Sequence, residues 1–418
     1  MSLFRPLAGS SFRRLFVGMT TARIGDAMAT LVLVWVTLQA HGPAALGLVL
    51  LVAALPAIAI SPIAGHLVTR VGVRTSVRWD NIARAMAVLA LAAILAAGEP
   101  SMTSLLIYAL FAGLTGPASE IALDAATPEL VDDEHLTEAN ALVSLVWDLS
   151  DLAGPATAGF ILAALNAPFA LILVAGCYLS MALLVPTVPL EPTTADDDST
   201  GNENPCHGET PQQSSGVLTG FRLLLTRYRS SLYLTLVSLF VLFASGAQEV
   251  LLPLLVSETL HGGPAQLGLL TSIFAASTLV GTALISPRVA DLPVRPVVIV
   301  SLLIRGTGLA LLGGARRLSV AAAAGAGATL ADGPLYPVIR TAQQRLIPVH
   351  HRPLIAGARG AIGIAGYPLG NAIGGLLGAH LGPTNAILTI AVLHVIPIAA
   401  LALSRRPLTP PRRNSRRL

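Results

Sequence analysis

Long apolar segments recur along the whole chain, and short polar turns separate them. A hydrocarbon core about 30 Å thick needs roughly 20 apolar residues per helix. Because each segment has about that length, the pattern predicts twelve transmembrane helices in an all-α integral membrane protein. They cover residues 14–39, 44–68, 77–98, 102–125, 139–164, 167–188, 230–256, 265–286, 295–314, 318–339, 354–379 and 383–404.

One polar stretch interrupts this pattern between the sixth and seventh segments. Residues 191–216 are acidic and rich in Pro, Gly, Ser and Thr, which predicts a disordered linker. Residues 217–229 are amphipathic, and we expect them to lie on the inner membrane surface. The predicted organisation is a bundle over 1–190, a cytoplasmic linker over 191–229, a second bundle over 230–404 and a basic cytoplasmic tail over 405–418.

The two sides of the linker resemble each other. The segment HGPAALGLVL begins at His41, and HGGPAQLGLL begins at His261. A Gly-Pro pair begins at Gly116 in the fourth segment and again at Gly333 in the tenth. Such a duplication is typical of parallel-repeat transporters, so we predict two pseudo-symmetric six-helix bundles.

Composition excludes several other classes. The chain is 54% hydrophobic and 11% charged, with mean hydropathy +0.72, whereas soluble proteins carry about 25% charged residues. Nucleic-acid binding would need a basic face on a soluble fold, and the sequence predicts none. The His and Cys residues are scattered, so we expect no metal site. With no Lys there is no phosphate-binding Gly-x-x-x-x-Gly-Lys motif, and we expect no cofactor and no enzymatic activity.

Arginine placement predicts the topology. All 26 basic residues are Arg, and 21 of them lie in the segments that share one side of the predicted membrane with both termini. The opposite side holds only Arg316 and Arg317. The positive-inside rule therefore puts both termini in the cytoplasm, and we expect a multi-pass protein of the bacterial cytoplasmic membrane.

The turn between the second and third segments carries a recognisable pattern. It reads Gly65-His-Leu-Val-Thr69-Arg70-Val-Gly72-Val-Arg74. This resembles the Gly-x-Leu-Ala-Asp-Arg-x-Gly-Arg loop signature of the major facilitator superfamily. Thr69 stands where that family usually has Asp. A hydroxyl can cap a helix N-terminus but lacks the charge of Asp, so the resemblance does not extend to the gating role of this loop.

The fifth segment contains a second pattern, Gly154-Pro155-Ala-Thr-Ala-Gly159, which is similar to the antiporter signature of the same superfamily. The flanking text resembles the drug-efflux subfamily that includes macrolide and enterobactin exporters, and the resemblance covers nearly the whole chain. It implies the major facilitator fold, alternating access, a small-molecule substrate and protons as the coupling ion. We expect a monomer in the lipid bilayer.

Charges inside predicted spans are the candidate functional residues. A charge at mid-bilayer costs on the order of 3 kcal/mol and usually marks a pathway or a buried pair. In the family, spans one, four, seven and ten line a central cavity, and each carries a carboxylate here. Such a cavity would suit proton coupling and cationic or zwitterionic substrates, with Asp26 as the first choice of proton site. The candidates are Arg23, Asp26, Glu120, Asp148, Asp151, Glu249, Arg305 and Asp332.

Each candidate also has a purely structural interpretation. Asp26 could neutralise Arg23, and Arg305 with Asp332 could form a buried pair. Asp148 and Asp151 could be a substrate or proton site, or partners of Arg84.

Two further features have two interpretations each. A stripe of glycines in the eleventh segment, at positions 366, 370, 374 and 378, predicts either static packing or a sliding seam between the halves. The acidic loop with Asp132 and Asp133 follows the fourth segment, and its counterpart after the tenth segment carries Arg345, His350, His351 and Arg352. The two loops could form an intracellular gate or remain separately solvated.

The function that these observations favour is proton-coupled export of a small amphipathic compound, such as a drug, a secondary metabolite or a siderophore. Uptake of a nutrient by a permease of the same fold is the main alternative. A membrane enzyme or a non-transporting sensor is a weaker alternative, because the chain shows no hydrolase motif and no folded soluble output domain.

Overall fold

The computed structural model describes residues 4–98, 100–186, 213–285, 292–348, 351–404 and 408. Residues 187–212, and the tail except for Leu408, lie outside this part. So do the side chains of residues 57–67, 69, 213–218 and 353. The described residues form helices and turns and contain no strand, as the sequence predicted.

Eight helical elements precede the linker. They are η1 (Arg5–Ala8), α1 (Ser10–Val71), α2 (Val73–Ala97), α3 (Met102–Leu114), α4 (Pro117–Glu129), η2 (Asp133–His135), α5 (Leu136–Ala164) and α6 (Ala167–Leu184). Those that follow it are α7 (Gln213–Thr226), α8 (Arg229–Leu254), the π-helical turn η3 (Leu255–Thr259), α9 (Pro264–Ile285), α10 (Val294–Gly313), α11 (Leu318–Leu330), α12 (Asp332–Leu346), α13 (Arg352–Ile364), α14 (Gly366–Leu393) and α15 (Val395–Leu403).

Each of the twelve predicted spans coincides with a helix, part of a helix or two consecutive helices. Helix α1 turns at Gly42 and α14 turns at Gly382, both with positive φ, so that each holds parts of two spans. Eight stretches of the described chain are long and apolar enough to cross a membrane. The span at α5 is not among them and carries Asp148 and Asp151, and the span at α11 and α12 is split into two short helices.

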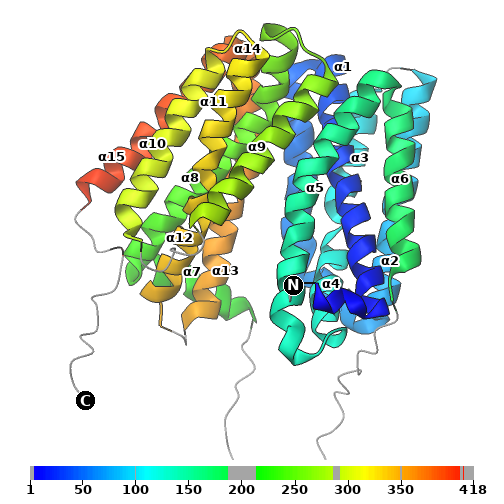
Figure 1. The fold of residues 1–418 in the computed structure, drawn as a ribbon. Helices are drawn as coiled ribbons and strands as arrows, with labels where there is room; N and C mark the ends of the chain where they lie inside the picture. The colour runs from blue at the N-terminus through cyan, green and yellow to red at the C-terminus, as the bar shows by residue number, and fades with distance from the viewer. Residues whose placement is uncertain are drawn as a thin grey trace, which may run out of the picture.

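The helices form two groups that meet along two lines of contact (Figure 1). Helix α5 of the N-terminal group packs against α9, and α1 packs against α14. The two groups splay apart toward the end that carries α4, α12, α13 and the N-terminus (Figure 1). The inter-group contacts are therefore concentrated away from that end.

Glycines bring the groups together at both lines. A Cβ atom placed on Gly375 would lie 2.9 Å from the Cα atom of Gly47, and one on Gly159 would lie 3.1 Å from the Cα atom of Gly268. The glycine stripe of the eleventh span faces elsewhere. Positions 366, 370 and 374 meet α8 backbone of the same half at residues 239, 243 and 247. The sliding-seam interpretation of that stripe was wrong, because its contacts lie almost entirely within one half.

The amphipathic segment after the linker is helix α7. Its apolar side packs against α13, where Leu224 joins Ile355 and Ala358 in one buried cluster. A hydrogen bond of 2.8 Å joins the Tyr228 hydroxyl, just after α7, to Nδ1 of His351. The segment predicted to lie on the membrane surface thus has a protein partner.

Candidate transport cavity

A cavity of about 470 Å³ lies between the two groups of helices. That volume falls within the range of about 300–1,000 Å³ that is usual for small-molecule sites. Its lining combines side chains of α1 and α5 with side chains of α8, α9, α10, α11, α12 and α14. Most of the lining is apolar. The charged residues in its wall are Arg23, Asp26, Asp151, Glu249, Arg305 and Asp332.

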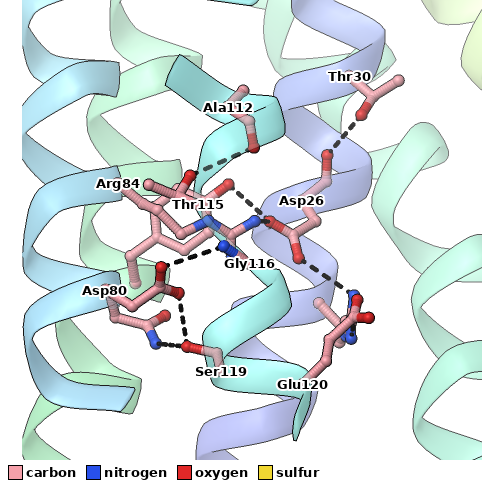
Figure 2. Close-up of polar contacts among 12 residues, drawn as sticks. Asp26, Thr30, Asp80, Arg84, Ala112, Thr115, Gly116, Ser119 and Glu120 are labelled. Atoms are coloured by element: carbon pink, nitrogen blue, oxygen red, sulfur yellow. Dashed lines mark hydrogen bonds and ion pairs between the residues drawn. The ribbon is translucent and has the colours of Figure 1, made fainter. Parts of the chain in front are cut away.

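Asp26 lies at the centre of a charged network in the N-terminal half (Figure 2). One carboxylate oxygen, Oδ1, accepts hydrogen bonds from Arg84 on α2 and from the Tyr178 hydroxyl on α6, the latter at 2.7 Å. The other oxygen, Oδ2, lies 3.7 Å from Arg23. The main partner of Asp26 is therefore Arg84, and the hypothesis that Arg84 pairs with Asp148 or Asp151 was wrong.

Arg23 has its own partners on two other helices. Its guanidinium donates to Glu120 on α4 at 2.8 Å and lies 3.6 Å from the ring centroid of Trp147 on α5. A guanidinium over an indole ring makes a favourable cation–π contact. Arg23 thus ties α1, α4 and α5 together at the cavity wall.

Arg305 and Asp332 form a direct ion pair in the C-terminal half. The Arg305 side chain is 1% exposed, and its second terminal nitrogen donates to Ser245 on α8 at 3.0 Å. The pair connects α10, α12 and α8. The direct pairing explains why two buried charges are tolerated, since removing either one would leave the other charge uncompensated.

Asp151 and Glu249 differ from the other charged residues of the cavity. They come from opposite halves, on α5 and α8, and the charge of Asp151 acts on Glu249. In the described part of the chain neither carboxylate has an ion pair. They are the two cavity carboxylates whose charge no arginine neutralises by direct contact.

Asp148 precedes Asp151 by one helical turn but does not line the cavity. Asp148 is exposed. Glu120 does not line the cavity either; its side chain is 49% exposed and pairs with Arg23, which does line it. The structure therefore separates the eight predicted residues into two groups: six that line the cavity and two that do not.

Sequence reasoning missed Asp80, Tyr178 and Ser245. The Asp80 carboxylate on α2 accepts from the Gly116 N–H at 3.0 Å and from the Ser119 hydroxyl at 2.5 Å, so it caps the start of α4 (Figure 2). A negative charge at a helix N-terminus is stabilising. The sequence did carry a signal for Asp80, namely the helix break at the Gly-Pro pair. Such a pair inside a span frees backbone N–H groups that need acceptors.

The conformational motifs lie at turns and at the contact between halves. Gly72 separates α1 from α2 with φ 81°, a conformation that strongly favours glycine. Gly65 is within α1, Arg70 is exposed, and Arg74 follows the turn. The Thr69 side chain lies outside the described residues.

The Gly154-Pro155 motif faces two helices. A Cβ atom on Gly154 would lie 2.5 Å from Cβ of Ala27 on α1, whereas Gly159 faces α9. The next residue after the proline, Ala156, donates its backbone N–H to the Ser272 hydroxyl on α9 at 3.1 Å. The motif therefore forms part of the contact between the two halves.

Among the described residues, no ion pair joins the two loops of the possible gate. Asp132 and Asp133 have no ion pair within the described residues. His350 lies outside them, and the N–H of His351 donates to the Pro348 carbonyl of its own turn. The same part of the chain contains no group of three or more His, Cys, Asp or Glu side chains that could hold a metal ion.

Comparison with known proteins assigns the architecture to a family. Residues 1–326 match the family model described as transmembrane secretion effector. An uncharacterised MFS-type transporter, y4rN of Sinorhizobium fredii, is 25% identical over 92% of this chain and 95% of its own length. The multidrug efflux pump Tap of Mycolicibacterium fortuitum is 23% identical over 92% of this chain and 93% of its own length.

Among solved structures, a bacterial homologue of the iron transporter ferroportin in an inward-facing state has the same fold. Its TM-score is 0.69 at 15% identity, and the match covers 94% of this chain and 98% of that protein. The fold, the membrane-spanning helices and the family match agree with one another. The chain is a multi-pass membrane transporter, and it belongs to the transmembrane secretion effector family of the major facilitator superfamily.

Proposed function

We propose that this transporter exports a small amphipathic cation from the cytoplasm in exchange for protons, by alternating access of the cavity between its halves. The observation that carries the proposal is the position of Asp151 and Glu249. Two carboxylates from opposite halves line one cavity without an arginine partner in the described chain. A cation between them would relieve the repulsion of like charges and would contact both halves at once.

The remainder of the lining supports an amphipathic substrate. The wall includes Trp147, Phe274 and Tyr367, together with several Leu side chains. Aromatic faces attract organic cations, and apolar side chains accept the hydrophobic part of such a molecule. The relative named as a multidrug efflux pump supports export rather than uptake.

Proton coupling would follow from competition between protons and the cation for the negative charge of the cavity carboxylates, Asp26 included. A carboxylate in a poorly solvated cavity holds a proton more readily than one in water, and a proton and a cationic substrate cannot both neutralise it. We place both termini in the cytoplasm on the basis of the arginine distribution, and propose a monomer in the bacterial cytoplasmic membrane.

The test is transport by purified protein in liposomes with an imposed pH gradient, using a panel of lipophilic cations and zwitterions. The wild type should move cations across the membrane in the direction opposite to the flow of protons. Asp151→Asn and Glu249→Gln should each reduce that movement about tenfold or more, since a hydrogen bond to a charged group contributes about 1.5–3 kcal/mol.

Asp148→Asn is the matched control, because Asp148 lies one turn from Asp151 on the same helix and does not line the cavity. It should keep wild-type transport. Cation movement in the same direction as the protons would support uptake instead. Equal loss in all three variants, or none in any, would contradict the assignment of Asp151 and Glu249.

A further inference from the structure

A second pocket, of about 210 Å³, lies inside the N-terminal half. Helices α1, α2, α3 and α4 supply most of its wall, and Met181 of α6 completes it. It shares only Arg23 and Asp26 with the transport cavity. Glu120, whose side chain is 49% exposed, also lines the second pocket and pairs with Arg23. Asp26 therefore lies in the wall shared by the two cavities.

The wall of this second pocket contains a buried polar atom without a partner. Asn81 is 1% exposed, and its amide nitrogen donates to the Val77 carbonyl and to the Ser119 hydroxyl. Its amide oxygen has no hydrogen-bond partner among the described residues. A buried acceptor of this kind is costly unless water satisfies it. The pocket has room for several water molecules, each of which occupies about 30 Å³ in the liquid.

The geometry of Asp26 leaves one oxygen available. Oδ1 accepts from Arg84 and Tyr178, whereas Oδ2 accepts no hydrogen bond from the described residues and lies 3.7 Å from Arg23. A proton can therefore add to Oδ2 without displacing either donor from Oδ1.

Arg84 would keep a carboxylate neighbour if Asp26 became neutral. Asp80 precedes it by one turn on α2, and the charges of both Asp26 and Asp80 act on Arg84. Arg305 in the other half differs. Its recorded partners in the described chain are Asp332 and Ser245, so neutralising Asp332 would leave a buried cation without compensation. The first pair can lose its negative charge at much lower cost than the second.

We propose that the second pocket is a water-filled proton path beside the substrate cavity, in which water molecules carry protons between Asp26, which lines both cavities, and the solvent near Glu120. The proposal rests on the proposed antiport. A hydronium ion in the pocket transfers its proton to Oδ2 of Asp26, so that one O–H bond breaks, one forms and a water molecule remains. Arg84 stays charged beside Asp80.

Several other groups act on this titration. The charged and titratable side chains around Asp26 come from its own helix and five others. They are Arg23 on α1, Asp80 and Arg84 on α2, Tyr108 on α3, Glu120 on α4, Asp151 on α5, and Cys177 and Tyr178 on α6.

Two substitutions fill the pocket without removing a charge. Ala112→Leu adds bulk from α3 and Ala22→Leu adds it from α1, since both alanines line the pocket. Ala90→Leu on α2 is the matched control, because Ala90 is exposed and lines neither cavity. Two filling variants are used so that the test can still be made if one of them does not fold.

The first measurement is independent of transport. Infrared difference spectra of the purified protein between acidic and neutral pH should show a protonated carboxyl band that Asp26→Asn removes. Hydrogen–deuterium exchange of that band should slow at least tenfold in the filled variants and remain unchanged in Ala90→Leu. Absence of an Asp26 band, or equal exchange in all variants, would overturn the proposal.

The second measurement uses the same variants in liposomes. Filling the pocket should reduce gradient-driven transport at least tenfold while substrate exchange at equal pH stays within twofold of Ala90→Leu. Loss of both activities alike would contradict a role of the second pocket in proton transfer alone. The wild type could instead show normal exchange of the Asp26 band but no gradient-driven transport. That result would refute the proposed antiport and would still support the proton site at Asp26.

Discussion

Gly159 on α5 and Gly268 on α9 bring the backbones of the two halves into direct contact. A Cβ atom on Gly268 would lie 2.2 Å from the Pro155 carbonyl oxygen, and one on Gly159 would lie 2.4 Å from the Pro264 carbonyl oxygen. No side chain can enter this contact without a shift of one helix. Because the antiporter-like motif supplies Pro155 and Gly159, its glycine and proline lie on the contact between the halves, where the proposed alternating access would require movement.

Gly268→Val should therefore impair transport more than it impairs folding. The added side chain would separate α5 from α9, and we expect the transport rate in liposomes to fall at least tenfold. Gly176→Val on α6 is the control, because no atom lies within 4 Å of a Cβ placed there. Wild-type transport in Gly268→Val would show that this contact can widen without consequence.

The buried pair of Arg305 and Asp332 should behave as one unit in stability measurements. Arg305→Met or Asp332→Leu alone should lower the free energy of unfolding by about 3–5 kcal/mol, because each leaves a buried charge unpaired. The double variant should be more stable than either single variant. Chemical denaturation in detergent measures all three, with the exposed Arg316→Gln as a control expected to stay within about 0.5 kcal/mol. Additive losses would contradict the pairing.

Trp147 should report substrate binding. Its ring contacts Arg23 and lines the transport cavity, whereas Trp79 is 65% exposed and lines neither cavity. In a protein with Trp147 as its one tryptophan, an amphipathic cation should change the fluorescence saturably. A protein that retains only Trp79 is the control and should show no saturable change. The same response from both proteins would indicate partitioning into the detergent or lipid instead of binding in the cavity.

The arginine distribution predicts which surfaces face the cytoplasm. In a variant with both native cysteines replaced by Ser, Arg316→Cys should react with a membrane-impermeant maleimide added to intact cells. Arg227→Cys should react only after permeabilisation. The opposite pattern would invert the topology and would reverse the direction of the proposed transport.

Much of the fold was readable from local features of the chain. The apolar segments predicted the helices, and the Gly-Pro pair at Gly116 accounts for the break between α3 and α4, where Gly116 has φ 99°. The pairing of Arg305 with Asp332 was also expected, because two opposite charges at similar depth in adjacent spans would be costly apart. These inferences depend on composition and spacing, which need no knowledge of how distant helices pack.

The sequence by itself determined that this protein is helical, spans a membrane and contains charges at depths where they need a partner or a role. Only the tertiary structure decided the partners. In the folded protein Arg84 pairs with Asp26, and the glycine stripe of α14 packs against α8. Asp151 and Glu249 line one cavity from opposite halves. The physical reason is that insertion depth follows from position along one helix, whereas an ion pair depends on the rotation and packing of helices far apart in sequence.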